Sequence, residues 1–138
     1  MNLVFIDTNV LVYAFDADAG EKFTKAQSIL KKCWDSQTGA VSTQVLQEFY
    51  VTITSKLTNK VEKQCARNIV QSFKAWPLHC ITPDNIIEAS EFEEKNKFSF
   101  WDSLIVVAAQ KIGANIIYSE DMQDGRQLGN LTIINPFQ

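Results

Sequence analysis

The stretch LVFIDTNVLVYA, residues 3–14, decides the fold that we expect. Its first four residues form a short, continuous apolar run, which is typical of a strand buried inside a parallel sheet. Asp7-Thr8-Asn9 follows this run, and a second apolar run begins at Val10, where we expect a helix. A buried strand, a polar turn and a helix in this order predict the first unit of an α/β domain, with Asp7 at the carboxyl end of the strand.

The rest of the chain repeats this alternation of short apolar strands and helices. Thr82-Pro83 is a strong helix start, because a capping residue precedes a proline, and Gly113 is expected to close the last helix. Gly39 is expected to break the helix that begins near Glu21. The expected helices cover about residues 21–34, 44–56, 61–75, 83–95 and 100–112, and the further strands cover 40–41, 78–81, 115–118 and 131–134. This pattern predicts one domain, residues 1–138, with helices on both faces of a parallel sheet (a three-layer α/β/α fold).

The composition of the 138 residues fits one globular domain, with 46% hydrophobic and 21% charged residues. No segment approaches the roughly 20 apolar residues that a membrane-spanning helix needs, and the N-terminus lacks the basic leading segment of a signal peptide. We therefore expect a cytoplasmic protein. The net charge of −3 argues against nucleic-acid binding through the overall field of the protein, so any such binding requires local basic patches or bound metal.

The three cysteines and the single histidine do not suggest a zinc site. Cys33, Cys65 and Cys80 are widely spaced, without a C-x-x-C pair, and we expect them to be small core residues. His79 lies alone on an expected strand, where a structural role is the simpler interpretation.

Four carboxylates are expected to approach one edge of the sheet. Asp7 and Asp121 follow the first and fourth strands, and parallel strands place their carboxyl ends at the same edge. Glu48 lies about one turn into a helix, on the border of its apolar stripe. Asp102 lies in the first turn of the most apolar helix of the chain.

Each of these acids also has an ordinary interpretation. Asp7 is a possible helix cap, Asp102 a possible member of a capping box with Ser99, and Glu48 a possible solvated helix residue. Capping alone gives no reason for them to converge, however. Like charges in one partly buried site repel one another and need neutralisation, which Mg²⁺ or Mn²⁺, ions that prefer oxygen ligands, would supply. The sequence therefore predicts a divalent-metal site.

The same segments resemble the motifs of PIN-domain nucleases. Residues 7–14 are similar to the opening motif of that family, and residues 42–48, 100–103 and 119–125 are similar to its later motifs, in the same order. The resemblance spans nearly the whole chain and is closest to VapC-type toxins of bacterial toxin–antitoxin pairs.

This resemblance implies a sheet of five parallel strands in the order 3-2-1-4-5. It places the metal site on four carboxylates, Asp7, Glu48, Asp102 and Asp121. It gives Asn9 and Ser119 a supporting role through hydrogen bonds. Some versions of the last motif carry a second acid two residues after Asp121, where this chain has Gln123, so Glu120 and Asp124 are candidate supporting acids.

We predict that the chain hydrolyses RNA phosphodiesters with a water molecule activated by Mg²⁺ or Mn²⁺. Asp7 and Asp121 would be direct ligands, and Glu48 and Asp102 would hold the water or a second ion. The products would carry a 5′-phosphate and a 3′-hydroxyl. The candidate contacts for the RNA backbone are Lys22, Lys25 and Arg126. RNA as the substrate, a homodimer and an antitoxin protein as partner follow from the resemblance alone.

Three alternatives stay open at this stage. One is a PIN-fold nuclease of RNA processing or DNA metabolism rather than a toxin, and another is an RNA-binding scaffold of the same fold with an idle site. The third is a haloacid-dehalogenase-type phosphatase with Asp7 as nucleophile. The third is disfavoured, because such enzymes carry D-x-D at this strand end and Asn9 takes the place of the general acid.

Overall fold

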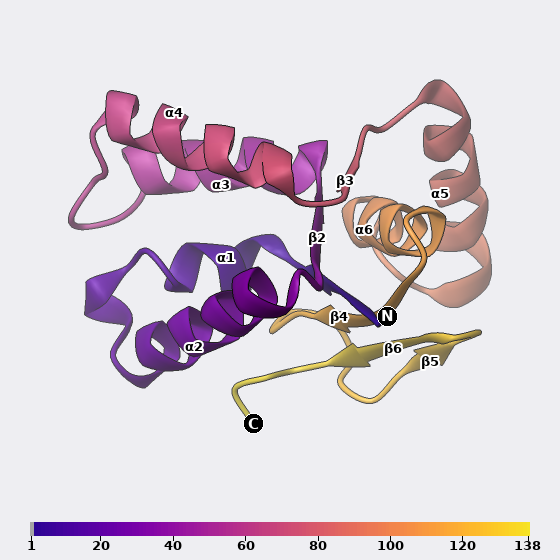
Figure 1. The fold of residues 1–138 in the computed structure, drawn as a ribbon. Coiled ribbons are helices and arrows are strands. Elements are labelled where there is room, and N and C mark those ends of the chain that lie inside the picture. The colour runs from indigo at the N-terminus through magenta and orange to yellow at the C-terminus, as the bar shows by residue number, and fades with distance from the viewer. Residues whose placement is uncertain (1) are drawn as a thin grey trace.

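A computed structural model describes residues 2–138, and its helices lie on both sides of a central sheet (Figure 1). The strands are β1 (Leu3–Ile6), β2 (Gly39–Ser42), β3 (Leu78–His79), β4 (Ala114–Tyr118), β5 (Gln127–Leu128) and β6 (Leu131–Ile134). The helices are α1 (Thr8–Tyr13), α2 (Glu21–Ser36), α3 (Thr43–Ser55), α4 (Lys63–Ser72), α5 (Pro83–Asn96) and α6 (Phe100–Lys111). Within residues 2–138, no helix combines the length and the apolar character needed to cross a membrane.

The strands follow the order β3-β2-β1-β4-β6-β5. The first five of these are parallel to one another, as predicted from the alternation of strands and helices. The sheet has a sixth strand, however, so the prediction of five parallel strands was incomplete. β5 runs antiparallel to β6 at the edge, with Leu128 opposite Leu131. The turn between these strands places Gly129 at φ 64°, a backbone conformation that glycine adopts readily.

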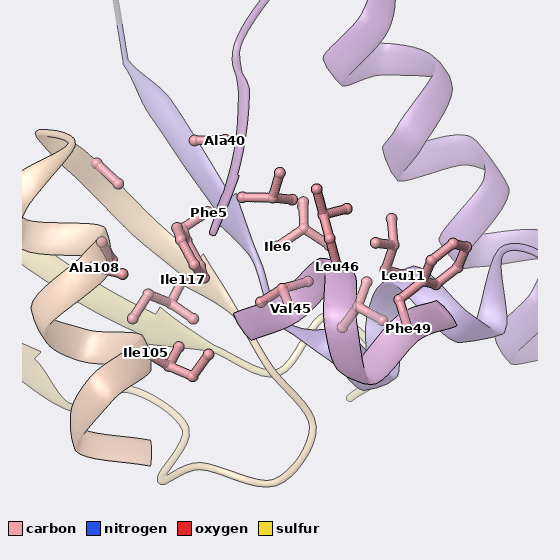
Figure 2. Packing of buried hydrophobic residues seen from close by; sticks show 14 of the residues in the cluster. Phe5, Ile6, Leu11, Ala40, Val45, Leu46, Phe49, Ile105, Ala108 and Ile117 are labelled. Carbon is pink, nitrogen blue, oxygen red and sulfur yellow. The ribbon is translucent and has the colours of Figure 1, made fainter. Parts of the chain in front are cut away.

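The core holds β1 from both sides and so fixes the position of Asp7. Phe5 and Ile6 of β1 are fully buried. Figure 2 shows Ile105 of α6 beside the sheet, and Phe49 of α3 near Leu11 of α1. Because β1 and α1 both belong to this cluster, the turn that carries Asp7 between them is anchored at each end.

Two predictions about local structure were wrong. Cys33 is buried, but Cys65 on α4 and Cys80 after β3 are exposed, because α4 turns Ala66 rather than Cys65 into the core and β3 ends at residue 79. Gly39 does not end α2. That helix runs to Ser36 and ends at Gln37, which has a left-handed backbone (φ 56°), while Gly39 is the first residue of β2.

Gly39 is instead required by the side chain of Trp76. A Cβ atom at position 39 would lie 2.6 Å from the Trp76 ring. That ring is buried and also packs against Phe73 (centroids 4.9 Å apart) and Trp34 (5.1 Å), so a Cβ atom at position 39 would force it out of these contacts. The edge of the sheet therefore depends on glycine at this position.

We expect Gly39→Ala to lower the free energy of unfolding by about 1–3 kcal/mol, because overpacking forces a buried ring out of place. Urea denaturation followed by circular dichroism measures this change. In a Trp76→Leu background the same substitution should cost clearly less, since the clashing ring is gone. An equal cost in both backgrounds would contradict the explanation.

Candidate functional site

Asp7 is a buried carboxylate at the junction of β1 and α1. Its Oδ1 accepts a hydrogen bond from the backbone N of Thr8 (2.7 Å), and its Oδ2 accepts one from the hydroxyl of Ser119 (2.7 Å). The pKa of Asp7 is raised from 3.8 to about 6, mainly by burial; the two hydrogen bonds act to lower it, and the negative charges of Asp102 and Glu48 act to raise it. Asp7 is thus the N-cap of α1 and also a buried acid in a field of like charge.

Asp102 and Glu48 reach the same region from α6 and α3. Ser99 caps α6 by accepting a hydrogen bond from the backbone N of Asp102 (3.1 Å). Burial raises the pKa of Asp102, the Ser99 hydrogen bond lowers it, and the charges of Asp121 and Glu48 raise it further. The exposed Glu48 is held by Thr8, whose hydroxyl donates to Glu48 Oε1 (2.6 Å).

The charges of Glu48 and Asp102 thus act on Asp7, and those of Asp121 and Glu48 act on Asp102, so each of the four predicted site residues has at least one of the others as a charged neighbour. Among residues 2–138, none of the four forms an ion pair with a lysine or arginine. A half-buried cluster of carboxylates without a cationic partner is electrostatically unfavourable until a cation arrives.

The donor atoms of this cluster fit Mg²⁺ or Mn²⁺. All are carboxylate oxygens, which these hard ions prefer. In the described part of the chain, no three acids, cysteines or histidines are arranged so that they could together hold an ion. An ion bound here would therefore be held directly by one or two carboxylates and would keep several waters, as Mg²⁺ usually does.

Ser119 and Asn9 connect the loop after β4 to the start of α1. The fully buried Ser119 donates to Asp7, and its oxygen accepts hydrogen bonds from the backbone N of Asp121 (3.3 Å) and of Met122 (3.4 Å). Asn9 Oδ1 accepts a hydrogen bond from the backbone N of Glu120 (3.4 Å). Ser119 thus contacts a predicted site acid directly, whereas Asn9 contacts the backbone of the loop.

The other predicted acids lie in separate interactions. Glu120 accepts a hydrogen bond from Tyr13 (2.6 Å) and forms an ion pair with Lys22. Asp124 Oδ1 accepts a hydrogen bond from the backbone N of Asn135 (2.7 Å), so it holds its own loop closed. Both side chains are therefore already engaged by partners within the chain.

The basic residues predicted to contact the RNA backbone differ in whether they already have partners within the chain. Arg126 donates to the carbonyl oxygen of Asn96 (3.3 Å) and lies 4.9 Å from the centre of the Phe98 ring. Lys22 is paired with Glu120, whereas Lys25 is exposed. Two of the three predicted phosphate contacts are thus already engaged within the chain.

Sequence reasoning missed the roles of Thr8 and Tyr13. Both lie in the opening motif, but their partners Glu48 and Glu120 are 40 and 107 residues away in the chain, and no local pattern marks such pairs. It also gave no role to Trp101, which is 63% exposed beside Asp102 and whose carbonyl oxygen accepts a hydrogen bond from Gln44 (3.3 Å).

Comparison with known proteins places this geometry in a family. A family model described as the PIN domain matches residues 4–124. No curated protein sequence matches the chain. The sarcin–ricin-loop-cleaving toxin VapC20 of Mycobacterium tuberculosis has a similar structure, with 19% identity, a TM-score of 0.63, and coverage of 86% of this chain and 89% of that toxin.

Two further solved structures share the fold. A chain of a toxin–antitoxin complex from Klebsiella pneumoniae is 15% identical, with a TM-score of 0.68 and coverage of 96% of this chain and 97% of that one. A chain of VapBC2 from Rickettsia felis, bound to promoter DNA, is 14% identical, with a TM-score of 0.64 and coverage of 95% and 96%. At these identities the structures show the fold alone, but the family model covers most of the sequence. This chain therefore belongs to the PIN domain family.

Proposed function

We propose that this chain is a cytoplasmic, divalent-metal-dependent endoribonuclease and the toxin of a type II toxin–antitoxin pair. The observation that carries the proposal is the buried Asp7 carboxylate, which lies among the charges of Asp102 and Glu48 without a cationic partner in residues 2–138. A fold with no use for a cation would gain stability by replacing such a group with a neutral one.

The four acids would have different roles in hydrolysis. Bound Mg²⁺ or Mn²⁺ would lower the pKa of a water molecule and stabilise charge on the phosphoryl oxygens. Asp7 and Asp121 would bind the ion, and Glu48 and Asp102 would orient the attacking water or hold a second ion. Thr8 and Ser119 each donate to the acids in the structure, which would keep the carboxylate oxygens in fixed positions.

RNA as substrate and an antitoxin as partner are supported by the structures that share the fold. VapC20 is described as a toxin that cleaves the sarcin–ricin loop, and other similar structures are toxin–antitoxin complexes. An antitoxin that blocked this site would be expected to offer the acids an arginine or lysine. A homodimer is proposed from the family resemblance alone.

Cleavage of defined single-stranded RNAs with and without Mn²⁺ tests the proposal. We expect cleavage with Mn²⁺, cleavage at background level in excess EDTA, and recovery when Mn²⁺ is restored. The products should carry a 5′-phosphate and a 3′-hydroxyl, because water rather than a 2′-oxygen attacks. A cyclic 2′,3′-phosphate would exclude this mechanism, and folded protein that never cleaves RNA with Mn²⁺ would favour the idle scaffold.

A further inference from the structure

Glu120 separates two residues of the proposed site, Ser119 and Asp121, but its own side chain is tied to the helices on the other side of the loop. Its Oε1 accepts a hydrogen bond from the hydroxyl of Tyr13 in α1 (2.6 Å), and its Oε2 forms an ion pair with Lys22 in α2. Together with Phe137, these residues make what we call the Glu120 latch: Tyr13, Lys22, Glu120 and Phe137.

The latch is a network rather than a single surface ion pair. The Lys22 ammonium lies 5.1 Å from the centre of the Tyr13 ring and 5.8 Å from that of Phe137, and the two rings meet edge to face at 5.3 Å. Burial alone would raise the pKa of Glu120, but the hydrogen bonds from Lys22 and Tyr13 outweigh this effect, so the pKa is lowered overall. An isolated exposed pair contributes little, whereas these contacts hold Lys22 in one place.

The loop that the latch restrains is also anchored on both sides of Asp121, by the hydrogen bond from the backbone N of Glu120 to Asn9 and by the buried side chain of Met122. Residues 119–126 form turns and bends rather than a helix or strand. The exposed Asp121 is held through its backbone N by Ser119 (3.3 Å), and the far end of the loop is closed by Asp124 and Asn135. The Glu120 side chain, next to Asp121 in the chain, adds a further restraint on the backbone from which the exposed Asp121 carboxylate projects.

We infer that the Glu120 latch positions the Asp121 carboxylate for metal binding, so that Glu120, Lys22 and Tyr13 are positioning residues and Lys22 is not a phosphate contact. This inference rests on the proposed function. The inference explains why Glu120 lies in the site loop without joining the clustered carboxylates. It also explains why Lys22 pairs with Glu120 rather than with those carboxylates.

Positioning and simple electrostatics predict opposite signs for one substitution. Lys22→Met removes a positive charge beside Glu120, the residue next to Asp121 in the chain, so electrostatics alone would strengthen the binding of a divalent cation. If Lys22 acts by holding Glu120, the same substitution releases the loop and weakens binding. Tyr13→Phe changes no charge and keeps the ring against Phe137, so it tests the hydroxyl alone.

Binding of Mn²⁺ to the purified protein, measured by electron paramagnetic resonance of the free ion, tests the inference without any cleavage assay. We expect the Kd for Mn²⁺ to rise about tenfold in Lys22→Met and in Tyr13→Phe, the lower range for loss of an outer partner of a metal ligand. Lys31→Met is the matched control, because Lys31 pairs with Asp35 on the same helix, away from the loop (2.9 Å). It should leave the Kd unchanged.

The possible results separate the two proposals. An unchanged or lower Kd in Lys22→Met, with a lower melting temperature, would mean that the latch only stabilises the fold, and would overturn the inference alone. Tyr13→Phe decides the question in the same way if Lys22→Met does not fold. Wild-type protein that binds no Mn²⁺ would overturn the proposed function and this inference with it.

Discussion

Asp7→Asn is expected to reduce Mn²⁺-dependent cleavage about a hundredfold to a thousandfold while making the protein more stable. The loss of activity follows because the amide supplies no charge to hold the ion, which is worth several kcal/mol of transition-state stabilisation. Cleavage of a defined RNA under single-turnover conditions measures this loss. The expected gain in stability has a separate physical origin.

The gain in stability comes from removing a charge that the folded state holds at a cost. Burial raises the pKa of Asp7 from an ordinary 3.8 to about 6. Above pH 6 the side chain is ionised in both states, and the ionised form is less stable in the folded protein than in the unfolded chain. The difference corresponds to roughly 3 kcal/mol. Asparagine is neutral and can still accept the hydrogen bond from Thr8, so we expect the free energy of unfolding at pH 7.5 to rise by about 1–3 kcal/mol.

Asp35→Asn provides the control for this experiment. It makes the same chemical change at an exposed acid that pairs with Lys31 on α2, and it should alter neither cleavage nor stability appreciably. Full activity in Asp7→Asn would remove Asp7 from the site. Lower stability in Asp7→Asn would mean that the carboxylate supports the fold rather than a function.

The fold could be predicted from the sequence where a buried strand consists of a continuous apolar run. Residues 3–6 and 131–134 were identified with the correct bounds for this reason. β5 was missed because two residues cannot show a period. The role of Gly39 was misjudged because its reason, the ring of Trp76, comes from a segment 37 residues further along the chain, and a glycine alone does not reveal which contact requires it.

The candidate site was predictable in part for a similar reason. Asp7 and Asp121 follow strands, and parallel strands bring their carboxyl ends together whatever the details of packing. The partners of Glu120 could not be predicted, because Lys22 is 98 residues away and the pair forms only after α2 has packed beside the loop. Position relative to strands thus locates the acids, whereas the residues that hold them depend on helix packing.

Mn²⁺ is expected to reverse the contribution of Asp7 to the pH dependence of stability. Without metal, the raised pKa of Asp7 means that its stabilising contribution is fully present below pH 3.8 and is lost as the pH rises through about 6. Mn²⁺ binds the ionised carboxylate, so its stabilising effect grows over the same range. Asp102, whose pKa is also raised by burial, should act in the same direction.

Thermal denaturation followed by circular dichroism, at pH 5 and pH 7.5 with and without Mn²⁺, measures this reversal. At a concentration of about 100 times the Kd at pH 7.5, Mn²⁺ should stabilise the protein by about 2.7 kcal/mol, or about 5–10 °C in melting temperature. At pH 5 and the same concentration, the shift should be no more than about half as large, because competition with one proton weakens binding about tenfold.

Two controls make this result specific to the acids of the site. NaCl at matched ionic strength corrects for general screening of a protein with net charge −3. Asp7→Asn should lose most of the Mn²⁺ shift at both pH values, whereas Asp35→Asn should keep it. If Mn²⁺ instead stabilised the wild type equally at pH 5 and pH 7.5, the ion would be binding groups that are already ionised at pH 5, such as exposed surface carboxylates, and the buried Asp7 could not be its ligand.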